Sequence, residues 1–130
     1  MVLGQTAILS ESSSSNKHGV IQSRCTYTAT ESDVVTRKHG NLYYMIERFN
    51  GAGECEKAYE NIVKFNDGAT GLTLLHSIGD EALLHTDSSN FALIVARKEN
   101  KMLRIKVNKL TNNTSLSKLK VLSARLLSQM

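Results

Sequence analysis

Two histidines and the acidic side chains near them are the residues of this chain best suited to chemistry. His76 and His85 flank a turn that holds Asp80 and Glu81, and Asp87 follows the second histidine by two positions. An imidazole within hydrogen-bond reach of a carboxylate can act in general acid–base catalysis, and the same groups can ligate a metal ion. A small hydrolase-like enzyme that uses His76, His85 and Asp80 is therefore one interpretation. The spacing matches no dedicated metal-binding motif, so we expect neither a metal site nor a cofactor, and Asp80 and Glu81 then simply solvate the turn.

The two cysteines, Cys25 and Cys55, offer thiols but no arrangement that would activate one. A catalytic thiol needs a base within hydrogen-bond reach and a third group that orients the base. Cys55 falls near the apolar side of a predicted helix, which is typical of a buried structural cysteine. The pair can form one disulfide in an oxidising compartment or stay as thiols in the cytoplasm, and the sequence leaves that choice open.

Basic residues are concentrated in the last quarter of the chain. Positions 97–130 hold nine Lys or Arg residues and one acidic residue, whereas the preceding positions hold seven basic and eleven acidic residues. Such asymmetry can mark an anionic partner, although a solvated strand face and a solvated helix face would explain it as well. Arg104, Lys106 and Asn108 alternate with apolar residues, so we expect them on one face of a strand and treat that face as the contact surface.

A nucleic-acid-binding protein is a weaker interpretation of the same charge. Single-strand binders combine basic grooves with stacking aromatics, and aromatic residues make up only 5% of this chain. If the last helix covers the Leu103 side of its strand, Arg104 and Lys106 face away from Lys118 and Arg125, which splits the charge between two surfaces. An acidic protein or an anionic membrane surface is an equal alternative. No stretch approaches the roughly 20 apolar residues of a transmembrane helix.

The first part of the chain predicts a tail and two strands. Residues 1–19 include a Ser-rich polar run that cannot bury enough apolar surface to offset the entropy of ordering, so we expect a flexible N-terminal segment there. Residues 20–130 then form a single α+β domain. Within it, residues 20–30 and 42–49 are rich in β-branched and aromatic side chains and predict two antiparallel strands.

The middle of the chain predicts one helix and a return to strands. Residues 54–65 carry apolar side chains at spacings of three and four, which makes one helical face. Strands should follow at residues 71–78, 82–87, 91–98 and 102–109. Strand 91–98 is apolar on both alternating sets, so we place it in the middle of the sheet. The hairpin at its end has Glu99 and Asn100 at the tip, and Asn100 tolerates the positive φ that such turns require.

A Leu-rich helix follows the last strand, and Thr114 is a good N-cap for it. After that cap, apolar residues at helical spacing line one face: Leu116, Leu119, Leu122, Leu126 and Met130, with Val121 and Leu127 at the margins. This stripe should lie on the sheet beneath Leu103, Ile105 and Val107. The order β-β-α-β-β-β-β-α predicts an α+β fold, an antiparallel sheet of about five to six strands packed with two helices.

Several of these segments resemble one group of proteins. The motifs are "LG" near the start, "CTYT" in the first predicted strand, "AYENI" in the helix and "IGDEALLHTDSSNFALIVARKENKMLRIKVNK" across the hairpins. Together they resemble bacterial exported or lipoprotein-like α+β domains, whose architecture is similar to the PsbP/Mog1-type sandwich. The resemblance covers residues 20–130 and is strongest from Ile78 to Lys109. It implies a fold and a periplasmic or envelope-associated setting, and it brings no catalytic residues with it.

This chain departs from that group near its first residue. The group's domains have an export signal and a helix before the "LG" segment, whereas Met1 nearly adjoins that segment here. A cytoplasmic location follows if Met1 is the true start. A missing helix would leave apolar sheet surface exposed, and pairing with a second copy would cover it, so we expect a homodimer.

The leading interpretation is a non-catalytic interaction or ligand-binding module. Its candidate contact residues are Arg104, Lys106, Asn108, His76 and His85. The geometry of the histidines separates this module from the hydrolase-like alternative. In an enzyme, His76 and His85 should share a concave pocket with a carboxylate, and in a module they should be scattered or packed singly.

Overall fold

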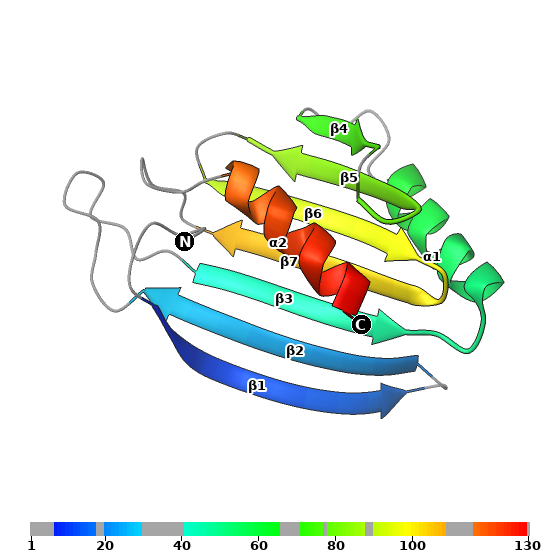
Figure 1. Cartoon of the computed structure of the whole chain (residues 1–130), viewed down its shortest axis with the longest axis horizontal. Helices are drawn as coiled ribbons and strands as arrows, with labels where there is room; N and C mark the ends of the chain where they lie inside the picture. Colours follow the sequence, from blue (N-terminus) through cyan, green and yellow to red (C-terminus); the bar gives the residue numbers. More distant parts are fainter. Residues whose placement is uncertain are drawn as a thin grey trace.

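The computed structural model describes residues 7–17, 20–29, 41–65, 71–76, 78–87, 90–108 and 116–129. Within them lie seven strands and two helices (Figure 1). The strands are β1 (Ala7–Lys17), β2 (Val20–Ala29), β3 (Asn41–Arg48), β4 (Leu72–Leu75), β5 (Glu81–Thr86), β6 (Phe91–Lys98) and β7 (Lys101–Asn108), and the helices are α1 (Ala52–Phe65) and α2 (Leu116–Gln129). All the strands pair antiparallel in one sheet of order β1-β2-β3-β7-β6-β5-β4. The predicted α+β class and antiparallel sheet are confirmed, with one strand more than expected.

The additional strand lies in the segment that we expected to be a flexible tail. Ala7–Lys17 forms β1 and pairs along its length with β2, at the edge of the sheet (Figure 1). The Ser-rich composition misled the prediction, because an edge strand far from both helices is held by backbone hydrogen bonds and needs little apolar surface. Ser14, Ser15 and Asn16 are exposed, as this position allows.

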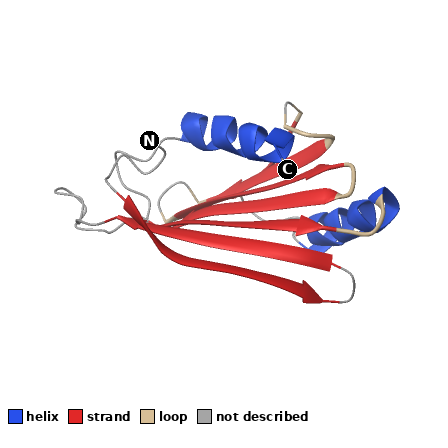
Figure 2. Ribbon diagram, turned by 60° about the horizontal axis from the view of Figure 1, so that its bottom comes forward, coloured by secondary structure: helices blue, strands red, loops and turns tan. Residues whose placement is uncertain are grey.

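The two helices cover opposite faces of the sheet (Figure 2). α2 packs against β6 and β7 and closes the larger core. Cross-strand partners share a face, so the alternate residues of neighbouring strands meet there. Buried side chains of this core include Leu42, Leu84, Ile94, Leu103, Ile105 and Val107 from the sheet and Leu119 and Leu127 from α2. The prediction that the last helix lies on Leu103, Ile105 and Val107 is confirmed.

The buried stripe of α2 is shifted from the one that we predicted. Its centre runs through Leu119, Ser123 and Leu127, while Leu122 and Leu126 are only partly buried. Ser123 has no exposed surface, and its hydroxyl donates a hydrogen bond to the Leu119 carbonyl at 2.8 Å. That bond lets a polar side chain occupy a core position. A pattern based on leucines alone does not include Ser123 as a core position. The prediction that Leu127 lies at the margin of the stripe is therefore wrong, since Leu127 lies at its centre.

Three other residues of the predicted α2 pattern have different outcomes. Val121 was placed at the margin of the stripe, and its side chain is 61% exposed. Thr114, the expected N-cap, and Met130, the expected last residue of the stripe, lie outside the described residues.

α1 covers the other face of the sheet near the end where β6 turns into β7. Cys55 and Tyr59 of the helix pack against Leu83, Val95 and Met102, and this forms a second core. β6 therefore contributes Ile94 to one core and Val95 to the other, with at most 1% of either residue exposed. The prediction that β6 is buried on both faces is confirmed.

The β6–β7 turn differs from the prediction in the residue that carries the positive φ. Glu99 has φ of 55°, and Asn100 is not among the positive-φ residues of the described part of the chain. Asp80 Oδ2 accepts the Glu99 amide at 2.8 Å, and Asn100 joins the turn to the end of β3 through two hydrogen bonds with Phe49. Asn100 is thus bound through its side chain and its carbonyl, and Glu99 takes the left-handed conformation instead.

Candidate functional site

The sheet face opposite α2 is only partly covered, because the contacts of α1 centre on Leu83, Val95 and Met102. Beyond α1, toward the other end of the same strands, polar and aromatic side chains gather. Register places them on one face, since Arg24 pairs with Met45, which pairs with Arg104, and Tyr43 pairs with Lys106. We call this surface the basic face and define it as Arg24, Tyr43, His85, Phe91, Arg104, Lys106 and Asn108.

Phe91 is at the centre of a small cluster on the basic face. The His85 ring meets the Phe91 ring edge-on, with centroids 5.1 Å apart and an interplanar angle of 88°. The Lys106 ammonium lies 5.3 Å from the Phe91 centroid, over the ring. A cation over an aromatic face is held by the ring quadrupole, which fixes this ammonium at the surface of the sheet. Within the described residues, no carboxylate forms an ion pair with Lys106.

Arg104 differs from Lys106 because it has an acidic neighbour. Its Nη2 lies 3.2 Å from Oε1 of Glu47, a glutamate that is only 5% exposed. Gln22 Nε2 donates to the other Glu47 oxygen at 3.2 Å. Arg104 and Glu47 form an ion pair but no hydrogen bond. Glu47 Oε1 and Arg104 Nε are both buried, and neither has a hydrogen-bond partner. Two buried polar atoms are thus left with unused hydrogen-bonding capacity beneath the basic face.

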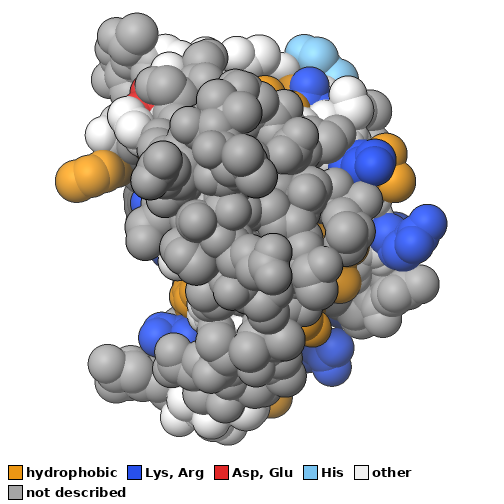
Figure 3. Space-filling model, turned by 90° about the vertical axis from the view of Figure 1, so that its left-hand side faces the viewer, with side chains coloured by type: hydrophobic (Ala, Val, Ile, Leu, Met, Phe, Trp, Pro, Cys, Tyr) orange, Lys and Arg blue, Asp and Glu red, His pale blue; other side chains and the backbone are white. Residues whose placement is uncertain are grey.

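The positive charge of the C-terminal quarter is divided between two layers. Arg104 and Lys106 lie on the basic face, whereas Lys120 and Arg125 are exposed on α2, on the other side of the sheet. Figure 3 views one end of the molecule, and Lys and Arg side chains appear at its margins on both sides. The total charge therefore exaggerates what either surface can present to a partner.

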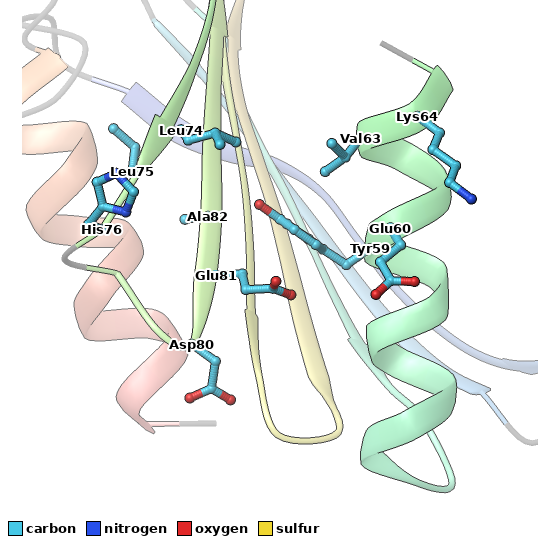
Figure 4. Close-up of a pocket in the computed structure, with 10 residues that line it drawn as sticks. All are labelled: Tyr59, Glu60, Val63, Lys64, Leu74, Leu75, His76, Asp80, Glu81 and Ala82. Carbon is cyan, nitrogen blue, oxygen red and sulfur yellow. The ribbon is translucent and has the colours of Figure 1, made fainter. Parts of the chain in front are cut away.

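A second feature is a cleft of about 410 Å³ between α1 and the β4–β5 edge (Figure 4). Val63 and Leu74 point toward each other across it, from the helix and from the strand. Tyr59 forms part of the inner wall, and the charged residues Glu60 and Lys64 of α1 also line the cleft. The cleft lies beside the α1 core, which reaches Leu83 of β5 and Leu72 of β4, while Leu74 further along β4 stays exposed.

Asp80 and Glu81 line the same cleft, but they do more than solvate a turn. Arg97 donates from Nε to Glu81 Oε2 at 3.1 Å, and its Nη1 lies 3.7 Å from Asp80 Oδ2. The Arg97 side chain is only 11% exposed. Burial lowers the pKa of this guanidinium, and the hydrogen bond and charge of Glu81, with the charge of Asp80, outweigh burial and raise it. Both acids thus form ion pairs with Arg97, a residue that the sequence interpretation did not include.

The structure separates the two histidines of the enzyme hypothesis. His76 lines the cleft with Asp80 and Glu81, but His85 packs against Phe91 on the basic face. His85 pairs with Leu72, and four more positions along β4 lead to His76, a displacement of roughly 13 Å at strand spacing. His85 is therefore not among the residues that line this cleft with His76.

The Cys55 thiol is buried in the α1 core. Cys55 has no exposed surface, and burial, with a smaller contribution from the Glu47 charge, raises the pKa of its thiol to about 11 despite the charge of Arg97. Such a thiol is protonated at neutral pH and is a poor nucleophile. Among the described residues, no group of three or more His, Cys, Asp or Glu side chains is placed to hold a metal ion. No helix in the described ranges is long and apolar enough to cross a membrane.

Three residues of the basic face, Arg24, Tyr43 and Phe91, and its buried acid Glu47 were missed in the sequence. Arg24, Tyr43 and Glu47 come from β2 and β3, far along the chain from the basic strand. They reach it because β3 pairs with β7, which places the N-terminal strands beside the last strand. The local signal was present, since Tyr43 and Glu47 occupy alternating positions of a predicted strand. A local alternating pattern predicts a strand but does not predict which strands pair with it in the sheet.

Together, fold and surfaces define a class of protein: an antiparallel α+β sheet with helices on both faces and a partly open basic face. No protein-family model matches the sequence, and comparison with curated proteins gives no match. The search of solved structures also finds no match.

Proposed function

We propose that this protein is a non-catalytic binding module that contacts an anionic partner through its basic face. The observation that carries this proposal is the Lys106 ammonium, which the Phe91 ring holds at the surface while no carboxylate in the described residues neutralises it. Arg24 is exposed on the same face, two strands away. Asn108 adds an amide beside Phe91, its cross-strand partner.

The proposal also accounts for the aromatic side chains. Lysine over an aromatic ring keeps its charge exposed while its flexible stem is restrained, which lowers the entropy lost on binding. Tyr43 lies beside Lys106 as its cross-strand partner and is partly exposed. A surface with fixed positive charge and flat aromatic area suits an anionic group on a larger partner better than a free ion.

Heparin affinity chromatography at increasing salt tests the proposal directly. We expect the double variant Lys106→Gln and Arg24→Gln to elute at clearly lower salt than the parent protein, because two unpaired charges leave the basic face. The matched control is Lys120→Gln with Arg125→Gln, which removes the same charge from α2 on the opposite layer. If both double variants lose retention equally, net charge alone determines heparin binding, and this result would refute the basic face as the contact surface.

The hydrolase-like alternative with His76, His85 and Asp80 has less support than the module. His85 is packed against Phe91, and Asp80 is engaged by Arg97 and by the Glu99 amide. A general acid–base pair would need both groups at one reacting centre.

Two further parts of the proposal rest on the sequence. The resemblance to PsbP/Mog1-type sandwiches supports a bacterial, envelope-associated setting. We also propose a homodimer, in which a second copy of the chain packs against the sheet. Native mass spectrometry of the purified protein tests the dimer and any retained non-protein mass together, and a monomer would remove the dimer from the proposal.

A further inference from the structure

β4 has only four residues and is the last of the described strands at this edge of the sheet, so one side of its backbone pairs with none of them. Thr86 donates its amide hydrogen to the Gly71 carbonyl at 3.1 Å, which marks Gly71 and Thr86 as a hydrogen-bonded pair. Bonded and non-bonded pairs alternate along an antiparallel ladder, so Thr73 is bonded toward β5. The N–H and C=O groups of Leu72 and Leu74 therefore point to the free edge.

The cleft lies directly beside this edge, on the face that carries α1 (Figure 4). Leu74 is 56% exposed although it is a large apolar residue, and its side chain points across the cleft toward Val63. A residue paired with Leu74 on an added strand would share its face and place its own side chain in the cleft. The volume of about 410 Å³ has room for such a side chain.

Charge around the cleft favours a basic residue near that apolar side chain. Glu60, Asp80 and Glu81 line it, against the single cationic side chain of Lys64 and a histidine. Arg97 neutralises part of this charge by binding Asp80 and Glu81. Glu60 has no ion pair or hydrogen bond within the described part of the chain. The cleft is thus locally acidic in a protein whose net charge is +4.

Among the described helices and strands, the opposite edge of the sheet has no comparable arrangement. β1 is longer, but both helices pack on β6 and β7, far from it, so no helix forms a groove beside its free edge. A bare edge provides backbone hydrogen bonds without selecting a side chain, whereas β4 combines a free edge with an apolar cleft and a local charge.

We propose that the β4 edge and the adjoining cleft bind an extended peptide segment by strand addition. The segment places an apolar side chain in the cleft between Val63 and Leu74, and a Lys or Arg two residues away lies near Glu60. Backbone hydrogen bonds to Leu72 and Leu74 supply part of the affinity, and the cleft selects the sequence. This surface is separate from the basic face, and the inference does not depend on the proposed function.

The test uses a defined probe and NMR of the full chain. The probe is an acetylated, amidated peptide of about eight residues, with threonine at alternate positions and valine, leucine and lysine at the others. We expect saturable shifts of the Leu72 and Leu74 amides and the Val63 methyls, with a Kd below about 1 mM. N-methylation of the probe's leucine removes the amide that points to β4 and should abolish binding, whereas N-methylation of a threonine removes an outward amide and should not.

Two protein variants make the assignment specific. Leu74→Thr keeps a strand-forming residue but removes apolar surface from the cleft, and we expect the affinity to fall about tenfold. Val121→Thr is the matched control, since Val121 is a similarly exposed apolar residue on α2. Amide spectra of both variants should show the unchanged fold.

Three outcomes would overturn the inference. They are the absence of shifts at about 1 mM probe, binding that survives N-methylation of the leucine, and an equal loss of affinity in the Val121 control. Loss of affinity in Glu60→Gln for the lysine-containing probe, but not for a probe with alanine in place of lysine, would support the charge assignment.

Discussion

Replacing Gly79 by alanine tests whether the junction of β5, β6 and α2 is as tightly packed as the structure indicates. Gly79 has φ of 58°, a conformation that costs an L-amino acid roughly 1–2 kcal/mol. A Cβ built at this position meets two atoms at 2.5 Å each, the Arg97 carbonyl oxygen and Leu127 Cδ2. The first is backbone, and the second belongs to a side chain that is only 2% exposed.

Neither neighbour can move away freely. The Arg97 carbonyl accepts the Asp80 amide at 2.7 Å, a hydrogen bond whose net contribution is about 1 kcal/mol. Leu127 is at the centre of the α2 stripe, where overpacking costs about 1–3 kcal/mol. With backbone strain added, we expect Gly79→Ala to lower the free energy of unfolding by about 2–5 kcal/mol.

Urea denaturation followed by circular dichroism measures this difference, provided that unfolding is two-state. Gly53→Ala is the matched control, because Gly53 lies in α1 and a Cβ there meets nothing within 4 Å. That variant should be neutral or more stable by up to about 1 kcal/mol. A Gly79→Ala variant within about 0.5 kcal/mol of the parent would refute the geometry of the junction.

Three further predictions concern the turn and the buried titratable groups. Glu99→Gly should raise the free energy of unfolding by up to about 1 kcal/mol in the same assay. Glycine adopts the positive φ without strain, and the hydrogen bond from the backbone amide of residue 99 to the Asp80 carboxylate is kept. Cys55, whose pKa is raised to about 11, should resist iodoacetamide at neutral pH in the folded protein and react on unfolding, as mass spectrometry would show. Burial, with the charge of Glu81, raises the pKa of Tyr59 from 10.0 to about 12. The contribution of Tyr59 to stability should therefore be complete below pH 10 and be lost as pH rises toward 12. Tyr59→Phe should remove that part of the fall in unfolding curves measured across the range.

The elements that the sequence predicted are those that bury a face. Strand β7 alternates Leu103, Ile105 and Val107 with polar residues, and such a pattern can come only from a half-buried strand. β1 gave no such signal, because an edge strand without a helix above it buries little and is specified by pairing with β2. The burial of Ser123 was equally unpredictable from an apolar pattern, since it depends on a hydrogen bond from the serine hydroxyl to the Leu119 carbonyl of the same helix.

The candidate sites were predictable only in part, for a different reason. Alternation placed Arg104 and Lys106 on one face, and the structure has them there. The association of Arg97 with Glu81 is a cross-strand pair, so it follows from the register of β5 and β6. A hairpin register worked out from the intervening turn could have indicated that pair. Tyr43 could not have been found in this way, since β3 and β7 are far apart in the sequence, with a helix and three strands between them, and only the sheet order brings them together.

The two faces of this sheet differ in what they bury and in which proposed binding surfaces they hold. α2 closes the larger core on one face with Leu119 and Leu127, and its exposed Lys120 and Arg125 contact neither proposed surface. α1 buries its contacts at one end of the other face, so the same layer holds both the basic face and the β4 cleft. Substitutions of exposed α2 residues should therefore leave both kinds of binding unchanged, whereas substitutions on the α1 side should separate them. A peptide probe that competes with heparin would contradict this division, because it would mean that one surface accounts for both.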